Sequence, residues 1–453
     1  MSKDKPQFSV AIIGGGVAGM TLTIALAKRG IDVRIYEQAP QFTEIGAGIA
    51  FSPNAKQAME QCDPLVHEAY LRVATSSGSP DKINTWYDFV DGYTGEDQWL
   101  FDVTRDAPAD GCHRAHFLEE MIKLVPEGVA QFNKHLDRIT DTGHSDPLTL
   151  EFSDGTTAKA DLGENMVLPN AYRFARLTDN RIVIGSDGIK SSVRGMMFGR
   201  DAPQAKPTYT HRYAYRGLLK MDNAIKALGK DLATNRTMHM GQDGHVLTFP
   251  VAHGKILNVV AFKYDPNDWT DARLVVPTTK ESAKHDFKDW GAKVRALLDL
   301  LEDKLDKWAI FDLGDHPLPT YAKGRIAVIG DAAHATGPHH GAGAGICIED
   351  SAILAELLHT AWTRLEKRST QIAKTEVLKK VLEVFDTVRR ERTQWLVQSS
   401  RESVELYEWR DRLCKRDPAK LKKQILWRNH KIWRVDIEDM VAEANRKLEE
   451  HVM

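Results

Sequence analysis

A glycine-rich turn near the N-terminus sets the strongest limit on how this chain can fold. Gly14, Gly16 and Gly19 follow the apolar run 10–13 and lead into a helical pattern over 20–28. In such a strand–turn–helix unit, the first glycine allows a tight turn, the second admits a pyrophosphate and the third lets the helix approach the strand. The free amides and the dipole at the helix start favour the phosphate charge. We therefore predict a dinucleotide-binding unit of the Rossmann type.

An acidic residue stands where this unit holds the ribose. A second apolar run, 33–36, ends at Glu37, and an acid about 20 positions beyond the glycines accepts hydrogen bonds from the adenosine ribose. A glycine turn in an ordinary α/β unit needs no such acid. The succession of strand, glycines, helix, strand and acid therefore favours a bound dinucleotide.

Two further glycine-rich motifs follow at wide intervals. One contains Asp187 and Gly188, and the other begins at Gly330 and continues to residue 345. The loop after the ribose-binding strand includes Gly48, which suits a chain that passes close to a ligand. The order and the separation of these motifs indicate that distant loops meet around one cofactor.

Composition and charge restrict the class of protein. The 453 residues suffice for two or three domains, and 42% hydrophobic with 27% charged residues is typical of a soluble globular protein. A formal net charge of −2 gives no reason to expect nucleic acid or an acidic membrane as a partner. No apolar stretch reaches the roughly 20 residues that span a bilayer, and the polar start lacks a signal sequence. We therefore expect a cytoplasmic protein without a membrane span.

The cysteines and histidines do not predict a metal site. The four cysteines are scattered without a C-x-x-C pair, which favours four buried thiols over disulfides or zinc ligands. His334 lies in the third motif without the partnered spacing of a metal ligand, so we expect it to pack or to support a neighbour. The cysteines are Cys62, Cys112, Cys347 and Cys414.

The pattern of strands and helices predicts an α/β chain with a Rossmann-like domain, an inserted mixed-sheet domain and a helical C-terminal region. Strand-like runs cluster after residue 208, a buried-strand pattern returns at 325–330, and the rest is almost entirely helical. The predicted divisions are 1–207 and 318–365 for the dinucleotide-binding domain, 208–317 for the inserted sheet domain and 366–453 for the helical region.

The segment 163–181 interrupts this organisation. Joining Leu162 directly to the run 182–185 would restore one continuous strand. The segment is either a surface excursion or translated intron sequence, and the mature transcript distinguishes the two, because intron codons would be absent from it.

The three motifs, in this order, resemble the group A FAD-dependent aromatic hydroxylases, the family of para-hydroxybenzoate hydroxylase. Within it the chain looks most like salicylate hydroxylase and the fungal dearomatising polyketide monooxygenases, from about Val10 to about Leu354. The resemblance implies an FAD-binding domain with tightly but non-covalently bound FAD, and NADH or NADPH as a transient co-substrate. It also implies a small phenolic substrate and O2 as partners, with a homodimer left open.

The resemblance also implies roles for residues around the cofactor. Asp331 is expected to accept a hydrogen bond from the flavin ribityl chain, and Arg114 to reach the flavin linker or the pyrophosphate. Asp187 and Gly188 are expected to shape a turn near FAD that also serves the nicotinamide cofactor, supported by Ser191 and Arg194.

The third motif is expected to face the flavin ring. Its backbone amides precede a helix predicted to begin near Ile346, and such a nest suits negative charge that develops on the ring. Pro338 is expected to fix the loop, while His339 and His340 are candidates for moving protons. The nest comprises Gly341, Ala342, Gly343 and Ala344.

Arg216 is the main candidate for substrate recognition. It ends a strand-like run, where an inward guanidinium can pair with a carboxylate or hold a phenolate ionised; a surface or interdomain salt bridge is the alternative. His113, His239 and Phe249 are expected to line the same cavity. Some dearomatising relatives carry a tyrosine near Phe249, and its absence here weakens the dearomatising interpretation.

We therefore predict a monooxygenase that hydroxylates a small phenolic acid through a C4a-hydroperoxyflavin, as when salicylate gives catechol and CO2. One alternative is hydroxylation or dearomatisation of a polyketide-derived phenol in secondary metabolism. Another is a flavoprotein reductase or oxidase without hydroxylase activity.

Overall fold

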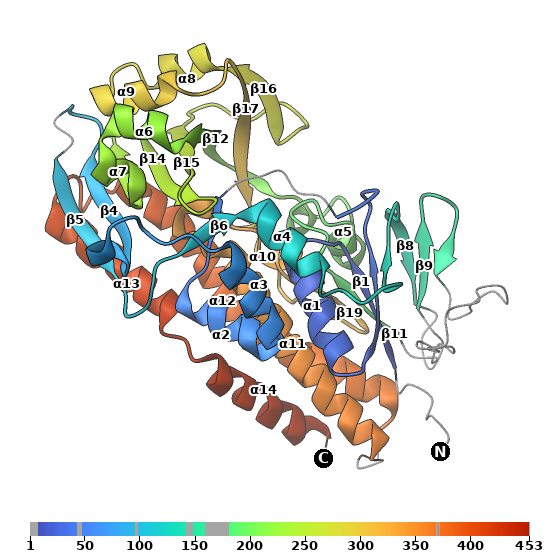
Figure 1. Cartoon of the computed structure of the whole chain (residues 1–453). Coiled ribbons are helices and arrows are strands. Elements are labelled where there is room, and N and C mark those ends of the chain that lie inside the picture. The colour runs from blue at the N-terminus through green and yellow to red at the C-terminus, as the bar shows by residue number, and fades with distance from the viewer. Residues whose placement is uncertain are drawn as a thin grey trace.

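The computed structural model describes residues 8–42, 48–95, 98–141, 148–158, 181–367, 370 and 372–452. Figure 1 shows a parallel sheet on one side of the molecule, a larger sheet on the other and long helices beneath them. Apart from Arg181, the segment 163–181 lies outside the described residues, so both interpretations of it remain open.

The first sheet confirms the Rossmann-type prediction. Its strand order is β18-β19-β11-β1-β2-β7, and all neighbours are parallel except β18 and β19. The central strand is wholly buried and leads through the glycine turn into helix α1 (Val17–Lys28). The strands are β1 (Ser9–Ile13), β2 (Asp32–Tyr36), β7 (Ala130–Gln131), β11 (Arg181–Gly185), β18 (Ala322–Lys323) and β19 (Ile326–Val328).

The second sheet is mixed and has eight strands in the order β16-β17-β12-β15-β14-β13-β4-β5. Only β13 and β4 pair in parallel. Two of its strands, β4 (Thr85–Asp91) and β5 (Trp99–Thr104), come from within 1–207, so the sheet extends beyond the segment 208–317. The other strands are β12 (Thr208–Lys220), β13 (Thr237–Gly241), β14 (Gly244–Val251), β15 (Ile256–Tyr264), β16 (Val275–Thr279) and β17 (Lys304–Asp312).

The two faces of this sheet bury different partners. Side chains alternate along a strand, so Tyr213 and Tyr215 lie on one face of β12 while Ala214 and Arg216 lie on the other. The tyrosines pack in a core with helices α6 (Met221–Leu228), α8 (Lys280–Asp286) and α9 (Ala292–Asp299). The opposite face is turned toward the first domain, and it carries the site.

Three helices, α12, α13 and α14, lie in the predicted helical region 366–453, and α11 leads into it from the segment 318–365 (Figure 1). Helix α11 packs against α1 and against α2 (Pro53–Cys62), and α12 and α14 pack against α11. Arg389 of α12 is wholly buried and pairs with Glu349 and Asp350 of α11, which fixes the two helices together. The helices are α11 (Gly343–Glu366), α12 (Lys374–Tyr407), α13 (Pro418–Trp433) and α14 (Ile437–Val452).

A two-stranded ribbon, β3 (Gly48–Ala50) with β6 (Gly111–His113), lies between the two sheets. No helix in the described part of the chain is long and apolar enough to cross a membrane. The remaining elements are α2 (Pro53–Cys62), α3 (Pro64–Val73), η1 (Pro80–Lys82), α4 (Arg114–Ile122), β8 (Leu136–Thr140), β9 (Thr149–Phe152), β10 (Thr157–Ala158), α5 (Ser192–Phe198), η2 (Pro203–Ala205), α7 (Lys230–Thr234), α10 (Asp331–His334) and η3 (Pro338–His340).

Candidate active site

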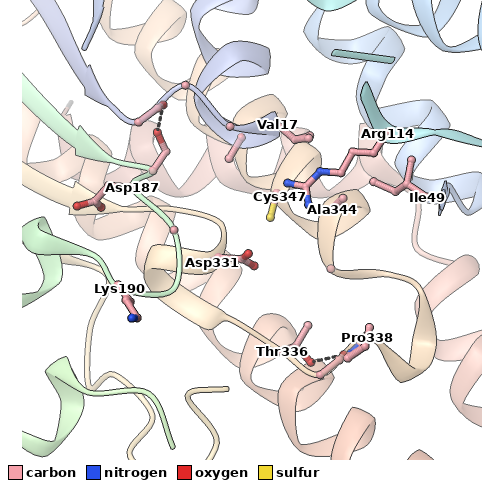
Figure 2. Close-up of a pocket in the computed structure, with 18 of the residues that line it drawn as sticks. Val17, Ile49, Arg114, Asp187, Lys190, Asp331, Thr336, Pro338, Ala344 and Cys347 are labelled. Atoms are coloured by element: carbon pink, nitrogen blue, oxygen red, sulfur yellow. Dashed lines mark hydrogen bonds between the residues drawn. The ribbon is translucent and has the colours of Figure 1, made fainter. Parts of the chain in front are cut away.

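A cavity of about 690 Å³ lies where the carboxyl ends of the parallel strands face the second sheet. All three glycine-rich motifs contribute to its wall, together with Arg114 of α4 and Arg216 of β12. Figure 2 shows Asp187, Asp331 and Pro338 around this space, with Arg114 reaching toward Ala344 from the other side. Ligands of open parallel sheets bind at this edge, so the cavity is the candidate active site.

The first motif has the shape that a pyrophosphate requires. Gly14 has φ +104°, and a Cβ there would lie 2.5 Å from the carbonyl oxygen of Ser186. A Cβ on Gly19 would collide with the carbonyl oxygen of Gly14, so this glycine allows helix and strand to touch. At Gly16 a Cβ would meet nothing within 4 Å, so its backbone borders open space. The space around the three glycines agrees with a tight turn, a close helix and an open phosphate site, and their contact with a pyrophosphate stays a prediction.

Glu37, the predicted ribose acceptor, is held at the cavity wall by two backbone amides. Its Oε2 accepts a hydrogen bond of 2.7 Å from the Gly15 amide, and its Oε1 accepts one of 2.7 Å from the Ala39 amide. Each carboxylate oxygen has a further lone pair, and the side chain lines the cavity. Two ribose hydroxyls can therefore be accepted without breaking either bond.

The third motif presents unused amides and a carboxylate. Helix α11 begins at Gly343, three residues before the predicted start at Ile346, so Gly343 and Gly345 lie within its first turn. The first amides of a helix have no partner inside it, and no side chain caps this end. Asp331 follows Gly330, which has φ +59°, and its side chain is exposed at the cavity wall. The amides suit the electron-rich edge of a flavin ring, and the carboxylate suits a ribityl hydroxyl.

Asp187 shapes its loop by capping helix α5. Its carboxylate accepts hydrogen bonds from the Ser191 hydroxyl at 2.5 Å and from the Ser192 amide at 2.7 Å. Burial raises the pKa of Asp187. Gly188 supplies the positive φ of the turn, +75°. Arg194 is wholly buried and donates to three backbone carbonyl groups, so it ties this loop to α10.

Arg216 is a cation without a protein anion. In the described part of the chain no carboxylate pairs with it, and its buried Nε has no acceptor. The guanidinium lies 4.5 Å from the ring centroid of Trp308. Burial, and then the charge of Arg114, lower the pKa of Arg216 to about 10. The group stays charged at neutral pH, and an anion in the cavity would stabilise it.

The floor of the cavity is aromatic and aliphatic. Phe249 lies there as predicted, with Leu247 beside it on β14 and Val260 and Phe262 on β15. Sequence reasoning missed Tyr87 of β4, which also lines the cavity. The strand alternation of residues 85–91 was the available signal, but only the pairing of β4 with β13 brings the tyrosine here.

The predicted histidines are not brought to the cavity wall. His339 packs against the rings of His245 and Phe262, and His340 lies 3.0 Å from the Ser399 hydroxyl of α12. Burial lowers the pKa of both, to about 4 for His340. His239 is fully buried in β13, and His113 precedes α4 outside the cavity lining. Their proposed roles in proton movement and substrate binding stay predictions.

His334 and the cysteines have structural surroundings. His334 lies 2.6 Å from the buried carboxylate of Asp350, in agreement with the expected packing role. All four cysteines are buried and free. Within the described ranges, no cluster of His, Cys, Asp or Glu can hold a metal ion.

Gly48 is a point at which the β3–β6 ribbon touches the second sheet. Its amide donates a 3.0 Å hydrogen bond to Oδ1 of Asn258, and a Cβ would collide with the Phe249 ring. Gly48→Ala is expected to push the ribbon outward and to raise the KM for substrate roughly tenfold, since overpacking costs about 1–3 kcal/mol. Steady-state kinetics checks this. Gly195→Ala, where a Cβ has room, is the control, and equal kinetics of the two variants would contradict the prediction.

Comparisons with known proteins agree with this geometry. A family model described as an FAD-binding domain matches residues 179–370, and a second with the same description matches 9–87. The FAD-dependent monooxygenase pigN of Monascus ruber is 46% identical, over 97% of each chain. Salicylate hydroxylase asL1 of Sarocladium schorii is 38% identical over 99% of this chain and 92% of its own length.

Solved structures share the fold. A salicylate hydroxylase in complex with its substrate matches with a TM-score of 0.80 and 33% identity, over 97% of this chain and 98% of the other. CtdE in complex with FAD and a substrate matches with a TM-score of 0.77 at 19% identity, over 98% and 99%, and this shows the fold alone. The chain therefore belongs to the FAD-dependent monooxygenases, the family of salicylate hydroxylase and of the fungal monooxygenase pigN, and it is a flavin-dependent aromatic monooxygenase that binds FAD.

Proposed function

We propose that the protein hydroxylates a small phenolic acid of the salicylate type at the expense of NADH or NADPH and O2. The observation that carries this proposal is Arg216, a half-buried cation at the cavity wall whose Nε is fully buried and which pairs with no carboxylate in the described part of the chain. A buried charge is costly unless it is paired. A substrate that brings a carboxylate or a phenolate supplies the missing charge, and the floor around Phe249 suits an aromatic ring.

The arrangement of donors supports a defined orientation of the phenol. The guanidinium of Arg216 attracts the anionic oxygen, and the charge of Arg114 nearby adds to the positive potential. A phenolate held in this way is favoured over the neutral phenol, because nearby positive charge lowers the pKa of an acid. An ionised phenol is more electron-rich and therefore more reactive toward an electrophilic oxygen.

Bound FAD, once reduced, supplies the activation of O2 that a hydroxylation requires. This chain's own residues orient and shield the reactants. The first-turn amides of α11 stabilise negative charge beside the cavity, and Asp331 holds a cofactor hydroxyl. The apolar side chains of Leu247, Val260 and Phe262 keep water from the substrate ring, which limits the loss of reducing equivalents to hydrogen peroxide.

Tyr87 gives a second prediction. Its hydroxyl oxygen accepts a 3.0 Å hydrogen bond from Arg236, so the hydroxyl proton is available for the cavity. Burial raises the pKa of Tyr87, which keeps it a donor at neutral pH. Tyr87→Phe is expected to lower kcat/KM about tenfold, as for a lost hydrogen bond to a charged oxygen, with FAD content unchanged. Steady-state kinetics on the yellow protein measures this, and an unaltered kcat/KM would remove Tyr87 from the substrate site.

Tyr87 also favours a second candidate function, hydroxylation or dearomatisation of a polyketide-derived phenol. The tyrosine that anchors the phenolate in dearomatising relatives is missing at Phe249, and the hydroxyl of Tyr87 can take its place from β4. Three strands, β15, β14 and β13, separate β4 from the strand of Arg216. A phenol larger than salicylate can therefore contact both the hydroxyl of Tyr87 and the guanidinium of Arg216.

Product analysis tests the proposal. The FAD-loaded protein is given NADH or NADPH with salicylate or with a resorcinol aldehyde, and products are identified by mass. Catechol with stoichiometric CO2 supports the first candidate, and one added oxygen without carbon loss supports the second. Oxidation of the nicotinamide that yields only hydrogen peroxide with every phenol would contradict both and indicate an oxidase.

A further inference from the structure

A second cavity, of about 560 Å³, lies beyond Arg216 and is lined by the same arginine. It occupies a split in the eight-stranded sheet. Strands β12 and β17 are paired as far as Tyr215 and Lys307. Beyond these residues β12 stays paired only with β15, as far as Lys220. Strand β17 stays paired only with β16. The two strands diverge into a wedge, and the second cavity fills it.

The wedge has an apolar interior and a charged rim. Leu218 is 44% exposed, and it shares the cavity face of β12 with Arg216. Trp308 forms the opposite wall, and the buried Leu301 and Leu305 close the side toward the helices. The side chain of Leu301 occupies the place where Gly217 would carry a Cβ. The exposed rim consists of Pro277, Glu302, Lys304 and Asp306.

Asn258 lines the second cavity and is hydrogen-bonded to a residue of the first. It stands opposite Leu218 in the register of β15 with β12. Its Oδ1 is occupied by the amide of Gly48, which lines the first cavity. This bond fixes the amide group, so Nδ2 must act as the donor, and it is buried without an acceptor among the residues that the structure describes. A buried donor without a partner is costly, which points to a ligand oxygen.

We propose that the wedge is a subsite for an unbranched acyl chain carried by the phenolic substrate. The inference rests on the proposed function, because the ring must lie in the first cavity beside Arg216. The carbonyl oxygen of the chain accepts from Nδ2 of Asn258, and the methylene groups lie between Leu218 and Trp308. A charged tail is disfavoured, because the interior of the wedge has no counter-ion other than Arg216, which the ring's anion uses.

The test compares 2-hydroxybenzoic acids that carry hydrogen, acetyl or hexanoyl at ring carbon 4, and a second series at carbon 5. Wild type is expected to show kcat/KM about tenfold higher for the hexanoyl compound of one series than for the unsubstituted acid, from burial of methylene groups. Dissociation constants from the change in flavin absorbance separate binding from turnover. Leu218→Trp fills the wedge from an exposed position. In this variant the ratio of kcat/KM for the hexanoyl compound to kcat/KM for the unsubstituted acid is expected to fall close to one.

Leu71→Trp is the matched control, because Leu71 is 53% exposed on α3 and lines neither cavity. It is expected to keep the wild-type ratio. A ratio near one in wild type, or the same ratio in all three proteins, would overturn the subsite. Oxygenation of the unsubstituted acid with no effect of chain length would overturn the subsite alone, whereas no oxygenation of any phenol would overturn the proposed function.

Discussion

Replacing Arg216 with alanine is expected to lower kcat/KM for the phenolic acid roughly 100-fold, or about 3 kcal/mol, while the protein keeps its FAD. No carboxylate among the described residues pairs with the guanidinium, which lies at the cavity wall, so its loss removes an attraction for the substrate anion. Stimulation of nicotinamide oxidation by substrate, followed at the flavin absorbance and by steady-state kinetics, measures the effect.

Arg216→Lys is the matched variant. It keeps the charge but lacks the planar fork that pairs with a carboxylate, so its activity is expected to fall between those of the wild type and the alanine variant. A charge-only role would give the lysine variant full activity. Normal substrate stimulation in Arg216→Ala would show that the arginine only packs on Trp308, where it lies 4.5 Å from the ring.

Replacing Asp331 with alanine is expected to weaken FAD binding at least about tenfold, since a hydrogen bond to a charged group contributes about 1.5–3 kcal/mol. The carboxylate stands exposed at the cavity wall, in the first turn of α10. The ratio of flavin to protein absorbance after purification, and the dissociation constant for FAD added to the apoprotein, measure this loss.

Two variants control this experiment. Asp331→Asn keeps the shape and one acceptor oxygen, so it is expected to retain more FAD than the alanine variant. Asp289→Ala removes an exposed aspartate outside the cavity and is expected to leave flavin content unaltered. Full retention of FAD by Asp331→Ala would refute the assigned role of the carboxylate.

Features that are local in sequence were predictable. The turn from Gly14 to Gly19 carries its chemistry in consecutive residues, and Glu37 follows at the distance that one helix and one strand impose. The long C-terminal helices were equally visible, because their apolar residues repeat along one face. Arg216 was a candidate because it ends a strand-like run, where an inward guanidinium can meet a substrate anion, and the structure places it at the cavity wall.

Features that depend on distant pairing were not predictable. Tyr87 reaches the cavity only because β4 joins β13, about 150 residues later in the chain, in the second sheet. The bond between Gly48 and Asn258 spans 210 positions. His339 and His340 follow Pro338 directly, yet the turn of η3 leaves only the proline on the cavity wall. Sequence adjacency does not determine which way a side chain points in such a turn.

The most direct measurement uses isotopically labelled oxygen. The FAD-loaded protein is supplied with NADH or NADPH, the preferred phenol and 18O2, and the product is examined by mass spectrometry. The account predicts that each product molecule carries one labelled atom and that one nicotinamide is consumed per product. Unlabelled product, or consumption of 18O2 that appears entirely as hydrogen peroxide with every phenol, would contradict it.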